Sequence, residues 1–434
     1  MMNTIEAAQQ LYKSLNDDHA KKPLEAGDSR YIPILSEQSG KDPIQKIHLR
    51  ILMTESQSVN LLTGYRGNGK STELRRLKAL LEQAGCAVIL LDMNDYIVQT
   101  KPIEISDFIL SLMAALSEAV QQKHDLDPIR RNYWERLADF LQTEVQLKDL
   151  KIDLKTLGAG AQLGASLHRD HDFKQQIQHQ LRGHTKGLVQ DARTFVADIV
   201  STFRTQNPDQ KVVLLVDSLE QIRGVGNTHD SQQVLQSVTE LFSGQASSLA
   251  FPLIHIVYTI PPYLSALAPN LGSSLGGHPL ISWPNVHVRD RTGIPDPAGL
   301  EVMTNMISQR YPDWQRLISV EQLHQLAMAA GGDIRDYFLL ISESMIILIM
   351  KKNHTLEADD LLYVANQLRN GMLPIARDDK QWLARIHASK DPELDNIDAL
   401  SSLARFIDGN LIMNYQNGAP WYDIHPLLEE IIQA

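Results

Sequence analysis

Cysteine is almost missing from this chain of 434 residues. The single cysteine, Cys86, allows no disulfide within the chain and no metal site built from several thiolates. It directly precedes the apolar run 87–91, and a cysteine in such a place is typically a small buried side chain. We therefore expect Cys86 to be buried and without a chemical role.

Long apolar runs are missing as well. No run of the sequence approaches the roughly 18 residues that a membrane-spanning helix needs. The first residues do not show the basic segment followed by an apolar stretch that marks a secretory signal. We expect a cytoplasmic protein that makes no membrane contact.

Positive charge is in deficit. The chain has 41 lysines and arginines against 52 aspartates and glutamates, a formal net charge of −11. A protein that binds nucleic acid over its whole surface needs an excess of positive charge, so the balance argues against that class and leaves only a local basic patch open. Hydrophobic residues make up 43% of the chain, which is ordinary for a globular protein of one to three domains.

A phosphate-binding motif spans residues 64–72. Gly64, Gly69, Lys70 and Ser71 satisfy the pattern G-x-x-x-x-G-K-[ST]. The apolar run 59–63 before the motif predicts a buried strand, and leucines at helical spacing within 73–83 predict a helix after it. This strand–loop–helix context favours a phosphate loop over an ordinary glycine-rich turn.

The residue types of the motif suit a nucleoside triphosphate. Glycines let the backbone curl so that successive N–H groups face an anion, and the start of the helix adds its dipole. Lys70 is expected to reach the β- and γ-phosphates and the Ser71 hydroxyl to bind Mg²⁺, so ATP and Mg²⁺ are the predicted cofactors. The predicted nucleotide-binding residues are Gly64, Tyr65, Arg66, Gly67, Asn68, Gly69, Lys70, Ser71 and Thr72.

Polar residues stand at the ends of two other predicted strands. The run 211–217 is apolar until it ends in Asp217, a pattern typical of a parallel strand buried on both faces. Asp217 would hold Mg²⁺ as a Walker B acid, and Glu220 would polarise the attacking water; the alternative for Asp217 is a capping residue. The strand 252–259 ends in Thr259, which could sense the γ-phosphate or the water.

The remaining sequence predicts helices with few other strands. Alternating apolar residues within 150–167 predict a strand or hairpin inserted between two helices, either an edge ribbon on the core or an exposed hairpin that contacts a partner or a neighbouring subunit. Residues 285–288 are expected to form a short last strand after a Gly/Pro/Ser-rich loop at 265–282. Helices are predicted at 297–310, 320–329, 334–350 and 355–369. The last segment, 374–434, is predicted to form two helices and a hairpin with an Asn-Gly turn at 417–418.

On these motifs, and on their order along the chain, the sequence resembles the AAA+ and STAND-like branch of P-loop ATPases. The resemblance implies an α/β fold, with a parallel sheet flanked by helices, a helical lid and a C-terminal winged-helix domain. The implied domains are an N-terminal segment at 1–41, an ATPase core at 42–293 with the hairpin insertion at about 148–170, the lid at 294–372 and the winged helix at 373–434.

The resemblance also implies roles for single residues. Thr259 falls where the family has its sensor-1 residue, and the segment 331–335 is similar to the start of the sensor-2 helix, which makes Arg335 the expected γ-phosphate contact. Many AAA+ members have consecutive Asp and Glu at Walker B, whereas here the second acid comes at Glu220, as in STAND-type proteins, and this leaves the catalytic acid open. Candidates for an arginine finger, or alternatively for surface ion pairs, are Arg223, Arg289 and Arg291.

The implied function is that of a regulatory ATPase whose nucleotide state controls homo-oligomerisation and a separate effector protein, a type frequent in prokaryotic defence systems. The alternatives are a DNA-associated loader or transposition-type ATPase, and a nucleotide-binding scaffold with little turnover. From residue 376 onward, five basic residues face ten acidic ones, which disfavours DNA binding by the tail. We expect the aromatic residues Trp421 and Tyr422 to belong to the core of the tail instead of stacking on bases.

Overall fold

The computed structural model of the chain describes residues 4–35, 41–123, 127–143, 166, 181, 183–224, 228–352, 355–392, 394, 399–415 and 421–433. It divides into two compact units. The sheet unit consists of Pro43–Thr63 and Arg76–Ser282, and the lid unit of Met1–Asp42, Gly64–Arg75 and Trp283–Ala434. The hairpin predicted at about 148–170 lies outside the described residues apart from position 166, and so does the predicted turn at 417–418.

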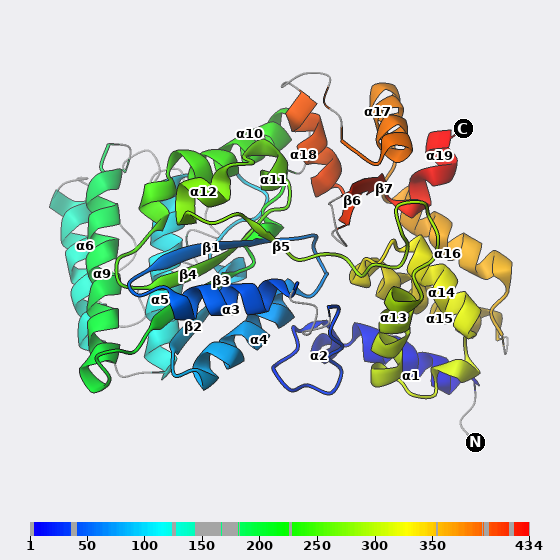
Figure 1. The fold of residues 1–434 in the computed structure, drawn as a ribbon, viewed down its shortest axis with the longest axis horizontal. Helices are drawn as coiled ribbons and strands as arrows, with labels where there is room; N and C mark the ends of the chain where they lie inside the picture. Colours follow the sequence, from blue (N-terminus) through cyan, green and yellow to red (C-terminus); the bar gives the residue numbers. More distant parts are fainter. Residues whose placement is uncertain are drawn as a thin grey trace. The chain divides into compact units, whose positions relative to one another are not determined.

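A five-stranded parallel sheet forms the centre of the sheet unit, in the order β2-β3-β4-β1-β5 (Figure 1). Every residue of β1, β3 and β4 is buried, which fits the apolar run 212–216 of β3, while β1 and β4 also bury polar side chains such as Asn60 and His255. The strands are β1 (Ser58–Thr63), β2 (Ala87–Asp92), β3 (Val212–Asp217), β4 (His255–Ile260) and β5 (Ile281–Ser282). The prediction of an α/β fold with a parallel sheet is confirmed.

Helices cover both sides of this sheet, with α12 on one side and α3 on the other in Figure 1. The helices of this unit are α3 (Pro43–Met53), α4 (Lys70–Gln83, up to Arg75 in the lid unit), α5 (Ile105–Lys123), α6 (Asp127–Thr143), α9 (Thr185–Gln206), α10 (Thr228–Thr239), α11 (Leu264–Leu267) and α12 (Leu271–Gly276). Helix α4 ends in a Schellman turn, in which Gly85 takes a φ of 84° and the Cys86 N–H donates to the Leu81 carbonyl at 3.0 Å. Cys86 is buried, as predicted.

Two predictions about the end of the sheet were wrong. Residues 265–282 contain α11, α12 and β5, and do not form one open loop. Gly276 is required by packing, because a Cβ there would lie 2.0 Å from the carbonyl oxygen of Val59, so glycine allows close packing on β1. The last strand is β5, whereas Val286, within the predicted strand 285–288, donates its N–H to Gly332 at 3.1 Å.

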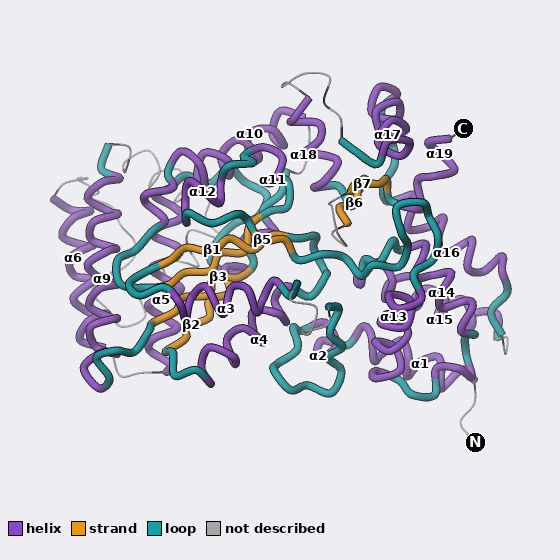
Figure 2. Tube along the Cα trace, in the orientation of Figure 1, coloured by secondary structure: helices purple, strands orange, loops and turns teal. Residues whose placement is uncertain are grey.

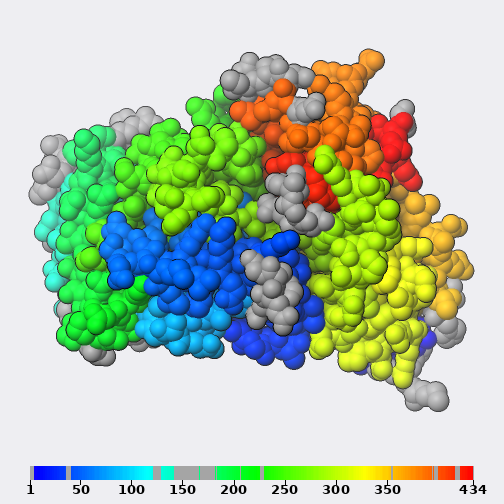
Figure 3. Space-filling view, viewed as in Figure 1, coloured from blue at the N-terminus to red at the C-terminus, as the bar shows by residue number. Residues whose placement is uncertain are grey.

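The lid unit contains a helical core. Its helices are α1 (Thr4–Asn16), α2 (Asp18–Lys21), α13 (Pro297–Arg310), α14 (Val320–Ala329), α15 (Ile334–Lys351) and α16 (Ala358–Asn370). Helix α1 buries Ala7, Ala8, Leu11 and Leu15 in the same apolar cluster as α13–α16. In the space-filling view, the dark blue N-terminal residues lie directly against the yellow-green residues of these helices (Figure 3), where Arg310 donates to the Arg30 carbonyl at 3.3 Å.

The tail has the predicted order of two helices and an antiparallel hairpin, the second group of strands in Figure 2. Its elements are α17 (Arg377–Ser389), α18 (Leu400–Asp408), β6 (Ile412–Tyr415), β7 (Trp421–Ile424), the 3₁₀ turn η8 (Pro426–Leu428) and α19 (Glu429–Gln433). Trp421 is buried and stacks on Tyr415 with ring centroids 4.2 Å apart, so it belongs to the core of the tail. The assignment of the tail to the winged-helix class stays a prediction. None of the described helices is both long and apolar enough to cross a membrane.

Candidate nucleotide-binding site

The backbone of residues 64–72 curls between β1 and α4. Gly67 and Gly69 have φ angles of 81° and 83°, in the left-handed region that side chains other than glycine rarely adopt. A Cβ at Gly69 would meet nothing within 4 Å, so there is open space beside the loop at this residue. Helix α4 starts at Lys70, which places the N-terminal end of its dipole at the end of the loop.

Lys70 is folded over this loop. Its side chain is buried, and Nζ donates to the carbonyl oxygens of Gly64 at 2.9 Å and Tyr65 at 2.5 Å. The Thr72 hydroxyl is engaged within the protein, since its Oγ1 accepts the N–H of Leu24 at 3.0 Å. With glycine-dependent curl, a lysine ammonium and the Ser71 hydroxyl at the start of a helix, the loop fits a magnesium-bound triphosphate, with Lys70 and Ser71 as the residues that would hold it.

Arg335 lies on the phosphate loop within the lid unit. A Cβ placed on Gly67 would lie 2.5 Å from Cβ and 2.7 Å from Nε of Arg335, so the two residues are in close contact. Arg335 is the second residue of α15, and its side chain is exposed. The structure therefore brings together the loop and the arginine that the sequence predicted to contact the γ-phosphate.

The three remaining predicted residues gather at the ends of β3 and β4 in the sheet unit. Asp217 is buried and accepts the N–H of Ser218 through Oδ1 at 2.8 Å. Thr259 donates to the carbonyl of Val216 at 3.4 Å and accepts the N–H of Leu219 at 3.2 Å, so its hydroxyl bonds to the backbone on both sides of Asp217. Glu220 is buried in the 3₁₀ turn Leu219–Gln221.

Ser218 is a feature of this turn that the sequence did not reveal. Its φ of 72° is in the left-handed region, a strained conformation for serine that often marks functional sites. The Asn94 amide donates to its hydroxyl at 3.1 Å. The strained residue directs the chain sharply away from β3, immediately after Asp217, and leads into the turn that carries Glu220.

The register of the sheet shows that β1 ends at the same edge as β3, which ends in Asp217. Thr63, the last residue of β1, pairs with Ile260 of β4, and Tyr258 of β4 pairs with Val216 of β3. Because the strands are parallel, β1 and β3 end at the same edge of the sheet, with β4 between them. Ligands of open α/β sheets bind at this carboxyl edge.

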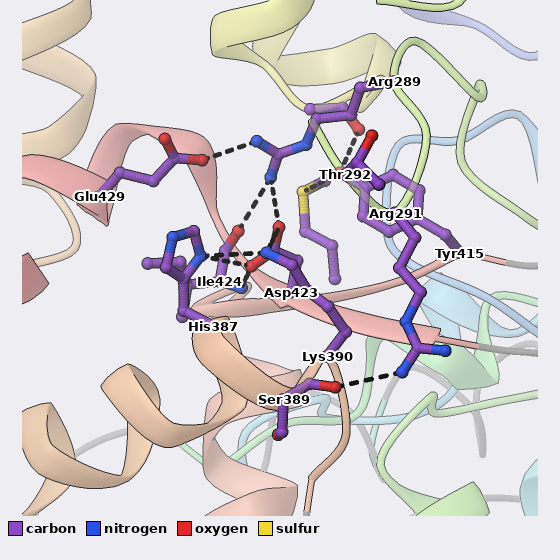
Figure 4. Close-up of polar contacts among 12 residues, drawn as sticks. Arg289, Arg291, Thr292, His387, Ser389, Lys390, Tyr415, Asp423, Ile424 and Glu429 are labelled. Carbon is purple, nitrogen blue, oxygen red and sulfur yellow. Dashed lines mark hydrogen bonds and ion pairs between the residues drawn. The ribbon is translucent and has the colours of Figure 1, made fainter. Parts of the chain in front are cut away.

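The three candidate arginine fingers differ in their surroundings. Arg223 and Arg291 are exposed, and Arg291 donates to the Ser389 carbonyl at 3.1 Å. Arg289 is buried in an ion cluster of the lid unit, where it donates to Asp423 at 3.0 Å and to Glu429 at 2.6 Å (Figure 4). In this arrangement its guanidinium is bound within the chain, which favours Arg223 and Arg291 over Arg289 as residues that could reach another subunit.

The same cluster contains His387, Asp423 and Glu429, whose ligand atoms are close enough together for a metal ion. Asp423, however, also accepts from Lys390 at 2.7 Å and from Arg289 (Figure 4). Two cationic side chains on one carboxylate would repel a third positive charge, so we interpret the group as an ion-pair network. The predicted metal-binding residues remain Ser71 and Asp217.

A buried pair of acids stands at the start of α15. Burial raises the pKa of the Asp333 carboxyl to about 7, and the nearby Asp336 carboxylate contributes to the rise. Asp333 also caps α15, since its Oδ1 accepts the N–H of Asp336 at 3.0 Å. On the tail side, the buried His425 accepts the N–H of Leu427 through Nδ1, so its Nε2 carries the proton that is shared with Asp336 at 3.3 Å.

A strand–loop–helix phosphate site on a parallel sheet, with an acid at the end of β3, gives the chain the fold of a P-loop NTPase. No protein-family profile matches the chain, and no curated protein sequence matches it.

Solved structures resemble the chain at a distance. The ORC2 protein of Aeropyrum pernix, in its ADPNP–ADP complexes, has a TM-score of 0.43 and 10% identity over 97% of both chains. The ORC1 protein of the same organism, in complex with DNA, has a TM-score of 0.37 and 12% identity, also over 97% of both chains. A Walker-type ATPase of Pyrococcus abyssi has a TM-score of 0.38 and 13% identity over 93% of this chain and 99% of its own. These likenesses are remote, so the class rests on the chain's own sheet and loop.

The raised pKa of Asp333 predicts a pH-dependent stability. The folded chain holds this proton up to about pH 7, whereas the unfolded chain loses it near the ordinary value of 3.8. The stabilisation is therefore complete below the unfolded pKa and is lost as the pH rises through the folded pKa. We expect Asp333→Asn, which keeps the cap without the charge, to flatten the fall in the free energy of unfolding across this range, measured by urea unfolding.

The matched control is Asp296→Asn, at the N-cap of α13. Burial acts to raise the pKa of Asp296, but hydrogen bonds from His287 and the Ala298 N–H outweigh it and hold the pKa below its usual value. Its contribution is present above the unfolded pKa, so this variant should keep the fall seen in the wild type. An equal fall in Asp333→Asn would show that Asp333 does not cause it.

Proposed function

We propose that the protein binds and hydrolyses ATP as a regulatory ATPase of the AAA+/STAND-like type, in which the state of the phosphate loop is transmitted to the tail. Lys70 would contact the β- and γ-phosphates, Ser71 and Asp217 would hold Mg²⁺, and Glu220 would orient and polarise the attacking water. Bound Mg²⁺ neutralises charge that develops on the phosphates. Thr259 would position the turn that carries Glu220, and Arg335 would contact the γ-phosphate.

The observation that carries this proposal is that the tail bonds directly to the phosphate loop within the lid unit. The Tyr65 hydroxyl donates to the Ile412 carbonyl at 2.8 Å, and Arg66 pairs with Asp408 at 3.2 Å. Both tail residues lie more than 300 positions further along the chain. With Arg335 against Gly67, the loop contacts both the lid and the tail, so a phosphate-dependent change in the loop would alter contacts with each.

A partner protein fits the tail better than DNA does, because acids outnumber basic residues two to one from residue 376 onward. We propose that the intramolecular contacts at Tyr65 and Arg66 belong to a resting form, since they occupy tail groups that a partner or a second copy could otherwise bind. ATP would then favour release of the tail and self-association, with Arg223 or Arg291 supplied to the neighbouring subunit. Control of a separate effector, including one in a defence system, would act through the same release.

Lys70→Ala tests nucleotide binding. The variant loses the ammonium that should contact two phosphates, and charged hydrogen bonds contribute about 1.5–3 kcal/mol each, so we expect ATP affinity to fall about 100-fold or more. Isothermal titration calorimetry measures it. Lys78→Ala, on the same helix but paired at the surface with Glu82, is the control and should bind as the wild type does. Full binding by Lys70→Ala would refute the site.

Glu220→Gln separates hydrolysis from binding. General-base catalysis contributes about 10²–10⁴-fold, so we expect phosphate release to fall by about that factor while ATP affinity stays near the wild-type value. Glu240→Gln, an exposed acid of the same unit, is the control. If hydrolysis by Glu220→Gln is unchanged, another group is the catalytic acid. If the wild type itself shows no turnover, the protein is a nucleotide-binding scaffold.

Asp408→Asn tests the coupling of loop and tail. A half-buried ion pair contributes about 1 kcal/mol, so removing it should lower, by about fivefold, the concentration of non-hydrolysable ATP analogue that half-saturates self-association. Light scattering measures the mass, and Asp378→Asn, an exposed acid of α17, is the control. An unchanged midpoint would contradict the proposed coupling. Association that occurs only in a parallel sample with DNA would favour the DNA-associated alternative.

A further inference from the structure

Asn68 is a residue of the loop whose polar groups reach two other segments of the lid unit, residues 283–285 and the start of α15. Its side chain is fully buried. Its Oδ1 accepts the N–H of Ile334 at 3.2 Å, its Nδ2 donates to Oδ1 of Asn285, and its carbonyl accepts Nε1–H of Trp283 at 2.8 Å. The consensus motif leaves this position unspecified, so its chemistry belongs to this chain.

The orientation of the Asn68 amide follows from its partners. Ile334 offers a backbone N–H, which can only donate, so the oxygen of Asn68 has to face α15 and the nitrogen has to face Asn285. Asn285 then accepts with its oxygen, and its own Nδ2, which is buried, has no partner within the described part of the chain. The contact to Ile334 is therefore specific to an acceptor at position 68.

This contact caps α15. The first N–H groups of a helix have no partner inside the helix, and the Asp333 carboxyl accepts that of Asp336. Asn68 satisfies the N–H of Ile334, the first residue of the helix. Arg335 is the next residue, and its side chain is the one that lies on Gly67.

We propose that Asn68 is a positioning residue, which holds the start of α15 against the phosphate loop and so sets where Arg335 reaches the γ-phosphate. The inference rests on the proposed function. It adds the residue, Asn68, that would place Arg335 where it distinguishes a triphosphate from a diphosphate. A carboxamide suits the task, because one end bonds to α15 and the other to Asn285. Without it, the start of α15 would lose one of its two side-chain caps, and Arg335 would be less well placed.

The test compares ADP with a non-hydrolysable ATP analogue by calorimetry. Arg335→Ala should reduce the preference for the analogue about tenfold, since a contact to the third phosphate is lost. Asn68→Ala should reduce the preference for the analogue in the same direction. The double variant should lose little more of this preference than Arg335→Ala alone, because both changes weaken the same contact, that of Arg335 with the third phosphate. Asn285→Ala, which leaves the bond to Ile334 in place, should keep the wild-type preference.

A purely structural role of Asn68 predicts another result. It would weaken both nucleotides by the same factor, leave the preference unchanged and add to the effect of Arg335→Ala, and this outcome would overturn the proposal. Should Asn68→Ala not fold, Asn68→Ser is the second variant, since its hydroxyl is too short to bridge Ile334 and Asn285. Failure of the proposed function looks different, because wild type and Lys70→Ala would then be equally poor at binding either nucleotide.

Discussion

The curl of residues 64–72 is the constraint on which the lid unit depends. A backbone that turns its N–H groups toward an anion cannot use them in regular secondary structure, so neighbouring groups have to hold its shape. Lys70 bonds to the carbonyls at the start of the loop. Asn68, in the middle of the loop, bonds to the first residue of α15. The groups that hold the curl are thus the groups that would register a change in the phosphates.

Buried polar contacts, in addition to apolar packing, connect the tail to the rest of the lid unit. The Tyr415 hydroxyl donates to the Gly331 carbonyl at 3.0 Å, His425 bonds to Asp336, and Arg289 joins Asp423 and Glu429. Breaking such a bond leaves a buried group unsatisfied, which costs about 1–3 kcal/mol. Contacts of this kind are either made or broken, and this all-or-none property suits an element that switches between two arrangements.

Most of the fold could be predicted from local pattern. The apolar runs of β1, β3 and β4, the helical periodicity of α13–α16 and the order of the tail elements all appear as expected, because burial and spacing are encoded within each segment. The errors came where a local signal has a nonlocal cause. Gly276 marks close packing of α12 on β1, and Val286 bonds to Gly332 outside the sheet.

The candidate site divides in the same way. The sequence alone predicted the phosphate loop with Lys70 and Ser71, Asp217 at the end of β3 and Glu220 after it, since a short motif carries its own chemistry. Only the tertiary structure revealed that Asn68 bonds to Ile334 and Arg66 to Asp408, or that Ser218 is strained. These pairs are separated by 266 and 342 positions. No local pattern specifies such a partner, because it is selected by which surfaces pack together once the chain has folded.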